Sequence, residues 1–424
     1  MESQDSRTPV ITIGLDSGLN FDYSMAELAA LVEANNMISV EEIRQSLDRP
    51  SPATYFGKGK VQELAEAAIE DDVHTIVVND ELTPSQIRNL EAETQVRIMD
   101  RTGLILEIFA NRAQSKEAKL QVELAKLQYQ LPRLHTSASQ RLDQQTGGGG
   151  GGFTSRGTGE SQTELTKRQI GKQISHVRHE LKEIRKSDET QRQQRERNKI
   201  PTVALVGYTN AGKSTIMNAL VREFGKGEDK QVFVKDMLFA TLDTSVRQLV
   251  FPDQKKLLLS DTVGFVSKLP TTLVEAFRST LSEAANADLL LQVVDFSDPN
   301  RDEMMATTEQ TLKDIGVTDI PMVTIYNKAD LTDVDYPREV GDHLVVSAKD
   351  PASLELITKV MKEKVFKDYV TVDFLIPFND GHVVAYLNDH ADVKSTEYVA
   401  EGTQLTVELS RTDLEHFSQY VISD

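Results

Sequence analysis

The sequence predicts an α/β protein built from four parts. Apolar, β-rich runs alternate with helical patterns over residues 1–112 and again over 199–365, which is typical of α/β domains with mostly parallel sheets. Two long helical patterns separated by a glycine-rich stretch occupy residues 113–198 and predict a helical hairpin. Residues 366–424 follow the order strand, helix, strand, strand, which predicts a small α+β module.

The composition is that of a globular protein without disulfides. The 424 residues are 39% hydrophobic and 27% charged, and the absence of cysteine excludes disulfides and cysteine-based metal sites or nucleophiles. No apolar run approaches the roughly 18 residues of a membrane span. The opening MESQDSRTPV lacks the basic and apolar regions of a signal peptide. We therefore expect a cytoplasmic protein.

Charge is unevenly distributed along the chain. The formal net charge is -19, and residues 368–424 carry eleven acidic residues against two basic ones. Residues 165–199, in contrast, carry eleven basic residues against five acidic ones. A local basic stripe on an acidic protein is compatible with nucleic acid, whereas the acidic C-terminal module is predicted to be a poor RNA binder.

The N-terminal α/β domain contains one short glycine pattern. FGKGK, residues 56–60, opens a helical pattern, and the backbone N–H groups at such a helix start can bind phosphate. Glycine and lysine are also common structural punctuation at helix starts. Both interpretations stay open at this point.

The two long helical patterns each carry one narrow apolar seam. The leucines of the first are spaced 4, 3 and 4 residues apart, and the apolar residues of the second are spaced 4, 3, 4 and 3 apart. Seams of this kind predict an antiparallel helical hairpin, with two core helices of a neighbouring domain as the alternative. The seam residues are Leu120, Leu124, Leu127 and Leu131 in the first helix, and Ile170, Ile174, Val177, Leu181 and Ile184 in the second.

A glycine-rich loop over residues 136–160 joins these helices. Six consecutive glycines, Gly147 to Gly152, would lose much backbone entropy on ordering, so one interpretation is an unstructured linker. Phe153 and Arg156 follow the glycines, and aromatic rings and guanidinium groups stack on bases. The other interpretation is therefore a tip that inserts into folded RNA.

The strongest motif lies at the start of the second α/β domain. VALVGYTNAGKST, residues 203–215, places Gly207-x-x-x-x-Gly212-Lys213-Ser214 between an apolar strand and a helical run, the context that a P-loop requires. The backbone of such a loop wraps phosphates, its lysine reaches the β and γ oxygens, and its serine ligates Mg²⁺. We predict a nucleoside triphosphate site with Mg²⁺ as cofactor.

Three further motifs follow on strand ends. Asp261-Thr262-Val263-Gly264 ends the strand KLLLSD, where the aspartate can hold Mg²⁺ through water and the glycine N–H can meet the γ-phosphate. Asn327-Lys328-Ala329-Asp330 ends the strand PMVTIYN, and Ser347-Ala348-Lys349 follows HLVVS. Asp330 can accept hydrogen bonds from guanine that adenine cannot supply, so ATP would leave its carboxylate unsatisfied. The motifs together predict a Ras-like GTPase domain.

Three positions bear on how such a domain would hydrolyse GTP. Among Thr241, Thr244 and Ser245, we expect Thr241 to complete the Mg²⁺ shell, with an ordinary loop threonine as the alternative. Arg247 is either an arginine that acts on the phosphates or a strand-surface residue. Phe265 follows Gly264 and cannot orient water by hydrogen bonding, which predicts slow unstimulated hydrolysis, a merely packed side chain, or both.

The motifs together resemble the HflX GTPases. The resemblance covers roughly residues 10–350 and rests on GYTNAGKST, FATLD, DTVGF, LVEAFRSTLSEAANADLLLQVVD and NKAD. It also rests on the upstream strings YFGKGKVQEL, LTPSQIRNLE, DRTGLILEIFANRA and KLQVELAKLQYQLPRL, of which QVELAKLQYQLPRL is more specific than any GTPase motif.

The resemblance implies roles for individual residues. By position it implies nucleotide contacts at Gly207, Tyr208, Thr209, Asn210, Ala211, Gly212, Lys213, Ser214, Thr215, Phe239, Ala240, Thr241, Leu242, Asp243, Asp261, Thr262, Val263, Gly264, Asn327, Lys328, Asp330, Ser347, Ala348 and Lys349. It implies Mg²⁺ contacts at Ser214, Thr241 and, through water, Asp261, and catalytic roles for Lys213, Thr241 and Gly264. It implies RNA contacts at Gly147, Gly148, Gly149, Gly150, Gly151, Gly152, Phe153 and Arg156.

The resemblance also implies a biological role. HflX proteins are cytoplasmic GTPases that bind the large ribosomal subunit and are implicated in splitting or rescuing stalled ribosomes, so we expect ribosomal RNA as a partner and a monomer when free. The alternatives are a large-subunit assembly GTPase and a regulatory GTPase switch that acts on a protein partner without RNA. Two departures are Thr244-Ser245-Val246-Arg247, where the family usually has Pro-Thr-Thr-Arg, and a glycine loop without the usual proline.

Overall fold

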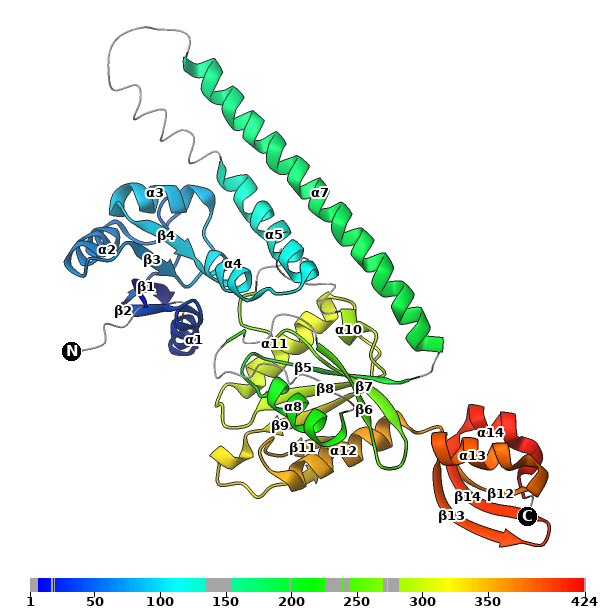
Figure 1. Ribbon diagram of the computed structural model, residues 1–424. Helices are drawn as coiled ribbons and strands as arrows, with labels where there is room; N and C mark the ends of the chain where they lie inside the picture. Colours follow the sequence, from blue (N-terminus) through cyan, green and yellow to red (C-terminus); the bar gives the residue numbers. More distant parts are fainter. Residues whose placement is uncertain are drawn as a thin grey trace, which may run out of the picture. The chain divides into compact units, whose positions relative to one another are not determined.

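The computed structural model describes most of the chain as two compact units (Figure 1). The described residues are 7–134 except 17 and 19, 155–197, 200–225, 238–239, 245–269, 273 and 282–422. The first unit contains the described residues before 193 together with 238–239 and those from 263 to 273. The second contains the remaining described residues. No helix in these ranges is long and apolar enough to cross a membrane.

The first unit begins with a parallel α/β domain. Its elements are β1 (Thr8–Asp16), α1 (Phe21–Ala34), β2 (Met37–Ser46), α2 (Lys58–Glu70), β3 (Thr75–Val78), α3 (Pro84–Thr94), β4 (Arg97–Asp100) and α4 (Arg101–Arg112). The strands pair in the order β2-β1-β3-β4, and every pair is parallel. All four carboxyl ends therefore lie at one edge of the sheet, where ligands commonly bind in open α/β sheets.

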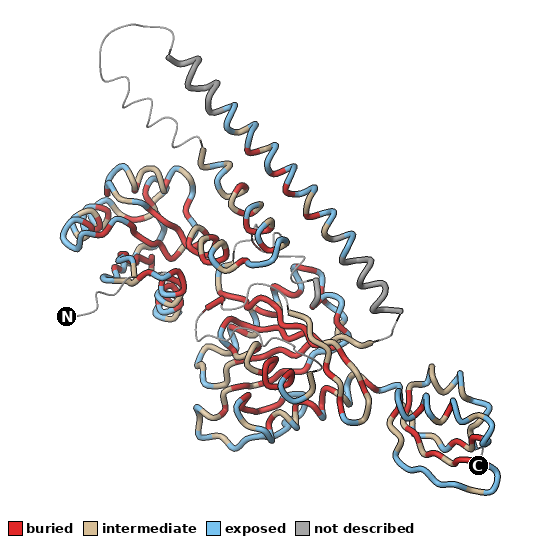
Figure 2. The backbone as a smooth tube through the Cα atoms, viewed as in Figure 1, coloured by how far each residue is buried: buried red, intermediate tan, exposed pale blue. Residues whose placement is uncertain are grey.

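The predicted helical hairpin is present in the same unit. Helix α5 (Lys116–Gln130) continues into the short helix η1 (Leu131–Arg133), and α7 (Ser155–Arg197) lies beside them (Figure 1). Both seams contribute to one apolar cluster, in which Leu127, Ile174 and Val177 are buried and Leu120 and Leu124 are partly buried. Figure 2 shows exposed positions along the rest of the described part of α7. The narrow seam thus stabilises a two-helix arm.

The second unit contains the P-loop domain. Its elements are β5 (Thr202–Gly207), α8 (Lys213–Phe224), β6 (Ser245–Val250), β7 (Lys256–Asp261), α10 (Ser282–Ala285), β8 (Leu289–Asp295), α11 (Arg301–Asp314), β9 (Met322–Asn327), η2 (Ala329–Leu331), β10 (Arg338–Val340), β11 (His343–Val345) and α12 (Pro351–Val365). The strand order is β10-β11-β9-β8-β5-β7-β6. Only the edge strands β6 and β10 run antiparallel to their neighbours, so the motifs on β5, β7 and β9 end at one edge.

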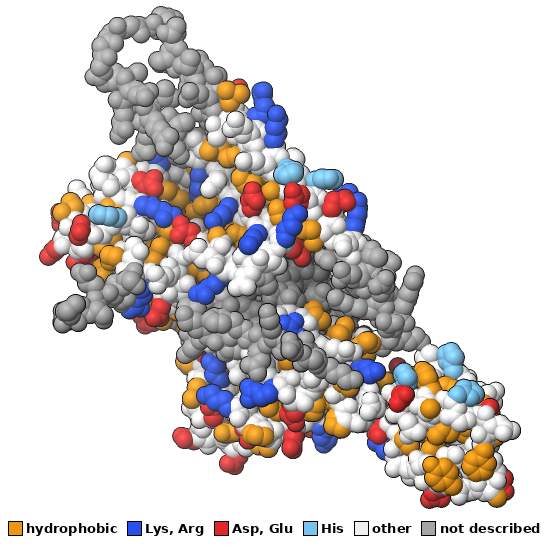
Figure 3. Space-filling view, viewed as in Figure 1, with side chains coloured by type: hydrophobic (Ala, Val, Ile, Leu, Met, Phe, Trp, Pro, Cys, Tyr) orange, Lys and Arg blue, Asp and Glu red, His pale blue; other side chains and the backbone are white. Residues whose placement is uncertain are grey.

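The C-terminal module is a three-stranded antiparallel sheet with helices, as the sequence predicts. Its elements are β12 (Tyr369–Ile376), η3 (Phe378–Asp380), α13 (Gly381–His390), β13 (Asp392–Val399), β14 (Gly402–Ser410), α14 (Arg411–Phe417) and η4 (Ser418–Tyr420). The strand order is β12-β14-β13. Phe374, Leu387 and Leu405 form its core, whereas Phe378 and Tyr398 are exposed, and Figure 3 shows several hydrophobic side chains on its surface. The predicted fold class is confirmed.

Candidate nucleotide site

The loop between β5 and α8 has a backbone that only glycine fits at two positions. Gly207 has φ +142° and Gly212 has φ +97°, in the region that favours glycine. A Cβ atom at Gly207 would lie 2.2 Å from the Val293 carbonyl oxygen, and one at Gly212 would lie 2.2 Å from Asn327 Nδ2. These close approaches explain the spacing of the motif, because a side chain at either glycine would displace the loop.

Lys213, the first residue of α8, folds back over this loop. Its Nζ donates hydrogen bonds to the carbonyl oxygens of Gly207, at 3.0 Å, and Tyr208, at 2.7 Å. The residue is only 6% exposed, and this burial lowers the pKa of Lys213 to about 8, although the charge of Asp261 opposes the shift. A buried ammonium held by carbonyls is poised to bind an anion, because an anion would offset its desolvation.

Ser214 and Asp261 meet beside this lysine. Ser214 Oγ donates to Asp261 Oδ2 at 2.6 Å, and Asp261 is fully buried. Its other oxygen, Oδ1, has no hydrogen-bond partner in the described structure. Burial raises the pKa of Asp261, although Lys213 and Ser214 oppose the shift. An unpartnered buried carboxylate oxygen is costly.

This pair fits a magnesium ion. Mg²⁺ prefers oxygen ligands and usually keeps several water molecules while it binds one or two protein groups and substrate phosphates. In the described ranges, no group of three or more His, Cys, Asp or Glu side chains could hold a metal by itself. A hydroxyl, a carboxylate and phosphate oxygens would therefore have to supply the site together, which is what the Ser214–Asp261 pair allows.

One side chain of the base-reading motif, that of Asn327, bonds to the backbone of two other loops. Asn327 Nδ2 donates to the Ala211 carbonyl at 2.9 Å, and Asn327 Oδ1 accepts from the Ala348 N–H at 2.9 Å. The P-loop, the end of β9 and the Ser347-Ala348-Lys349 loop are thus connected through one amide. Lys328 forms an ion pair with Asp295 at 2.7 Å, which fixes the start of η2.

Asp330 is held by two side chains and stays accessible to a ligand. Ser347 Oγ donates to its Oδ1 at 2.8 Å, and Lys349 Nζ donates to its Oδ2 at 3.3 Å. Partial burial opposes ionisation, but the hydrogen bonds from Ser347 and Lys349 outweigh it and lower the pKa of Asp330. The side chain is 22% exposed, so a charged carboxylate is oriented and still open to a ligand.

Phe265 and Phe239 are both buried in the first unit. Phe265 is 2% exposed and Val266 is fully buried, which agrees with a packed side chain at position 265. The Phe239 ring lies edge-on to Phe109 of α4, with 4.6 Å between the ring centroids. The segment before β6 and the segment after Asp261-Thr262-Val263-Gly264 therefore each include an aromatic side chain that is anchored by packing.

Several predicted residues lie outside the described ranges. They are Ala240, Thr241, Leu242, Asp243 and Thr244 of the loop before β6, and Gly147 to Gly152 with Phe153 of the glycine loop. Arg156 lies on α7, but its side chain is not described. Arg247 lies on β6, where its Nη1 donates to the Val246 carbonyl at 2.9 Å, which agrees with the strand-surface interpretation.

The N-terminal glycine pattern has a structural role. Gly57 is the N-cap of α2, and its N–H donates to Gln45 Oε1 at 2.9 Å. Lys60 forms an ion pair with Glu63 at 2.7 Å. Because these groups already have partners, the structure favours structural punctuation over a phosphate-binding turn.

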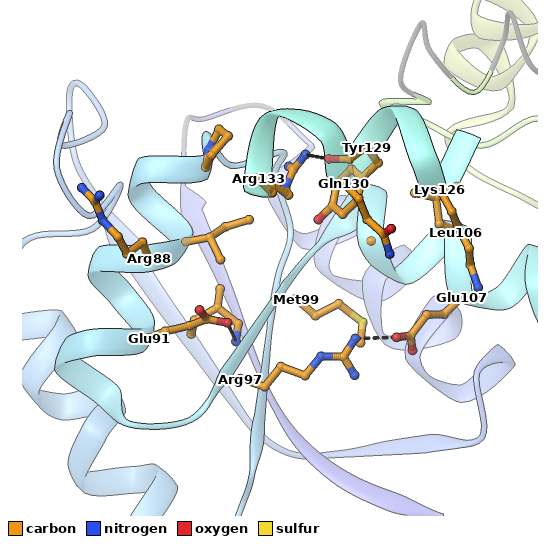
Figure 4. Close-up of a pocket in the computed structure, with 14 residues that line it drawn as sticks. Arg88, Glu91, Arg97, Met99, Leu106, Glu107, Lys126, Tyr129, Gln130 and Arg133 are labelled. Atoms are coloured by element: carbon orange, nitrogen blue, oxygen red, sulfur yellow. Dashed lines mark hydrogen bonds and ion pairs between the residues drawn. The ribbon is translucent and has the colours of Figure 1, made fainter. Parts of the chain in front are cut away.

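The first unit contains a cavity of about 500 Å³ that no sequence motif indicated (Figure 4). It is lined by residues of α3, β4, α4, α5 and η1, and includes none of the predicted nucleotide contacts. Of its charged lining residues, Arg97 forms an ion pair with Glu107 at 2.5 Å, and Arg133 forms one with Asp100, which is not part of the lining, at 3.1 Å. The Arg133 guanidinium also lies 3.4 Å from the centre of the Tyr129 ring.

Three family models match consecutive parts of the chain. Residues 22–110 match the family described as GTP-binding GTPase N-terminal, residues 112–195 match GTP-binding GTPase Middle Region, and residues 202–328 match 50S ribosome-binding GTPase.

Curated relatives match over nearly the whole length. The chain is 39% identical to the GTPase HflX of Caldanaerobacter subterraneus over 97% of this chain and 94% of the relative. It is 38% identical to that of Lacrimispora saccharolytica, over 95% and 93%, and 42% identical to that of Magnetococcus marinus, over 86% and 83%. The chain therefore belongs to the HflX family of GTPases.

Proposed function

We propose that this GTPase associates with the large ribosomal subunit in the cytoplasm and splits or rescues stalled ribosomes, acting as a monomer when free. The nucleotide part rests on the hydrogen-bonded pair of Ser214 and the buried Asp261, which has one unpartnered carboxylate oxygen and lies beside Lys213. The match of residues 202–328 to a 50S ribosome-binding GTPase family supports the ribosomal part.

We assign the phosphate contacts to the P-loop and the base contacts to the end of β9. The backbone from Gly207 to Thr215 binds the phosphates, and Lys213 turns from the loop carbonyls to the β and γ oxygens. Asp330 accepts hydrogen bonds from guanine, with Ser347 and Lys349 keeping its carboxylate charged and oriented. Asn327 couples the two halves because it bonds to both loops.

Ser214 and, through water, Asp261 would hold Mg²⁺, with Thr241 as the third ligand. When bound, this ion neutralises charge that develops on the phosphate oxygens. The chain itself orients the reaction: the Gly264 N–H donates to the γ-phosphate, and Phe265 provides no group that could orient the attacking water. Hydrolysis is therefore slow until a partner or the loop around Thr241 completes the site.

The arm gives this GTPase a surface suited to RNA. Exposed basic residues on α7 include Arg168, Lys172, Arg178 and Lys182, and Figure 3 shows basic and acidic side chains together along the arm. Lysine and arginine near phosphates release counterions, so binding to ribosomal RNA should weaken steeply as salt rises. We place the RNA contacts on this arm and on the glycine loop that joins its helices.

GTP turnover measured with and without purified large subunits tests the proposal. We expect stimulation by large subunits and none by small subunits, while Lys213→Ala and Ser214→Ala should have no turnover in either case. Absence of stimulation would remove the ribosomal part, and normal turnover in either variant would remove the site assignment.

Sedimentation of ribosomes separates splitting from assembly. Release of mature subunits from intact ribosomes supports splitting, whereas precursor large subunits bound to the protein support an assembly role. Deletion of Gly147 to Gly152 should abolish stimulation if the loop contacts RNA, and leave it intact if the partner is a protein.

A further inference from the structure

We propose that the second unit holds a binding site for a neutral aromatic small molecule that carries one hydrogen-bonding group. The site is a cavity of about 490 Å³ lined by residues of α8, the turn between β6 and β7, α12 and β14. None of the residues that line it is among the nucleotide contacts. The inference therefore goes beyond the proposed function, and its test requires neither GTP nor ribosomes.

The walls of the cavity are aromatic. Phe224 is the last residue of α8, Phe251 directly follows β6, and Phe366 is the C-cap of α12. Phe251 and Phe366 are buried, and Phe224 is partly buried and lies edge-on to Phe251, with 4.9 Å between the ring centroids. Ligand sites are usually cavities of about 300–1,000 Å³ with mostly apolar and aromatic walls. This cavity therefore has the size and the walls of a site for an aromatic ring system.

The aromatic walls are held in place by the protein itself. Lys362 Nζ lies 5.3 Å from the centre of the Phe251 ring, and Lys255 Nζ lies 5.6 Å from the centre of the Phe366 ring. Phe366 also lies edge-on to Tyr369, with 5.1 Å between the centroids. Contacts of this kind fix ring orientation. A ligand would thus enter walls that are already formed, which lowers the entropic cost of binding.

One face of α12 contributes the polar part of the cavity. The lining residues of this helix recur every three or four positions, so they share one face. They are Glu355, Thr358, Lys359, Lys362 and Glu363. The side chains of Lys359 and Glu363 are well exposed, whereas Thr358 is 8% exposed. Thr358 is therefore the polar group at the buried part of this face.

The hydroxyl of Thr358 lacks a hydrogen bond. Its Oγ1 is buried and has no partner in the described structure. Two buried threonines of α11 behave differently, because Thr308 donates to the Met304 carbonyl at 2.9 Å and Thr311 donates to the Thr307 carbonyl at 2.8 Å. A buried polar group without a partner is costly. A ligand that bonds to the Thr358 hydroxyl would remove this cost.

The charges around the cavity are balanced. Three lysines and three glutamates line it. Each ammonium group has a carboxylate partner: Lys255 with Glu408 at 2.6 Å, Lys359 with Glu363 at 3.9 Å, and Lys362 with Asp253. A charged ligand would have to displace one of these pairs or stay uncompensated in a partly buried site. Charge complementarity therefore favours a neutral ligand.

Three naphthyl probes test the site on the full-length protein. 2-Naphthol combines an uncharged aromatic body with a hydroxyl, naphthalene lacks the hydroxyl, and 2-naphthoate is charged. The chain has no tryptophan, so naphthyl fluorescence can be titrated without an indole signal. We expect one 2-naphthol per chain, bound about tenfold more tightly than naphthalene, the effect of a hydrogen bond to a buried group that otherwise has none. 2-Naphthoate should bind roughly tenfold more weakly than 2-naphthol.

Substitutions at Thr358 assign the binding to this cavity. Thr358→Val keeps the shape of the side chain and removes the hydroxyl, so it should weaken 2-naphthol about tenfold, to the affinity of naphthalene, and leave naphthalene unchanged. Thr358→Ser keeps the hydroxyl and should retain the preference for 2-naphthol. As the matched control, Thr311→Val removes a buried hydroxyl of α11 that does not line the cavity, and should change neither affinity.

Several results would overturn the inference. On the parent protein these are no binding of 2-naphthol, binding no tighter than that of naphthalene, or tighter binding of 2-naphthoate. Among the variants they are a preference for 2-naphthol that persists in Thr358→Val or is lost in Thr311→Val. Probe affinity that falls as dimers form in sedimentation equilibrium would assign the cavity to a second copy of the chain. Thermal melts show which variants are folded, and the three-probe comparison on the parent can reject the inference by itself.

Discussion

Lys213→Met should make the nucleotide-free protein more stable while it abolishes GTP binding. Lowering the pKa of this buried ammonium from 10.5 to about 8 corresponds to a cost of about 3 kcal/mol at neutral pH. Methionine removes that cost and fills the same space. It also gives up two hydrogen bonds to loop carbonyls, worth about 1 kcal/mol each. The expected net gain is about 1 kcal/mol.

Thermal melting of the parent and of Lys213→Met checks this magnitude. Without nucleotide, the transition of the P-loop domain should rise by about 2–4 °C in the variant. With GTP and Mg²⁺, only the parent should gain stability, because only the parent binds ligand. A nucleotide-free variant that melts below the parent would refute the argument that burial of this charge destabilises the site.

The lowered pKa of Lys213 also sets how the stability difference between the parent and Lys213→Met changes with pH. The folded pKa of Lys213 lies below its unfolded value, so the unfolded chain binds more protons between about pH 8 and 10.5. Stability of the parent relative to Lys213→Met therefore rises with pH through this window. The difference should be largest below pH 8, and a difference that grows above pH 8 would contradict the assignment.

Three further predictions follow from other residues. Asp330→Asn should weaken GTP binding at least tenfold, about the loss of one charged hydrogen bond, with little change in melting temperature, as measured by nucleotide titration. Phe265→Gln should raise unstimulated GTP turnover if the missing glutamine alone limits hydrolysis, and no change would assign the limit to another group. Ile174→Ala should destabilise the arm by about 2–5 kcal/mol, visible as faster proteolysis of α7, whereas Ser175→Ala on its exposed face should not.

Patterns within single segments explain why most of the fold was predictable. The P-loop, the Asp261 motif and the Asn327 motif all end parallel strands, and parallel strands bring their carboxyl ends to one edge. The bonds from Asn327 to Ala211 and Ala348 then follow from the topology. The two seams of the arm were likewise predictable, because heptad-like spacing identifies the apolar face of each helix.

The network around Ser267 could not be predicted in this way. Glu27 and Arg101, an ion pair in the N-terminal domain, both bond to Ser267. Glu27 and Ser267 lie outside the strings that carry the resemblance, Arg101 lies in DRTGLILEIFANRA without a role implied there, and charged residues on helices are usually solvated. Their contact depends on the tertiary arrangement that buries Arg101 beside Asn79. The sequence also could not predict that Asp261 Oδ1 is buried without a partner in the described structure. Residue spacing identifies a motif, but it does not give the hydrogen bonds of each oxygen.

These two buried charged sites differ in one respect that indicates their roles. Both oxygens of Glu27 accept hydrogen bonds from the protein itself, so its charge is compensated without any ligand. Asp261, in contrast, has one oxygen bonded to Ser214 and one without a partner in the described structure. A buried carboxylate satisfied by the chain stabilises one arrangement, whereas one left partly unsatisfied gains from a cation. The chain thus buries charge twice, once in a pair that holds Ser267 and once in a carboxylate that the proposed Mg²⁺ would satisfy.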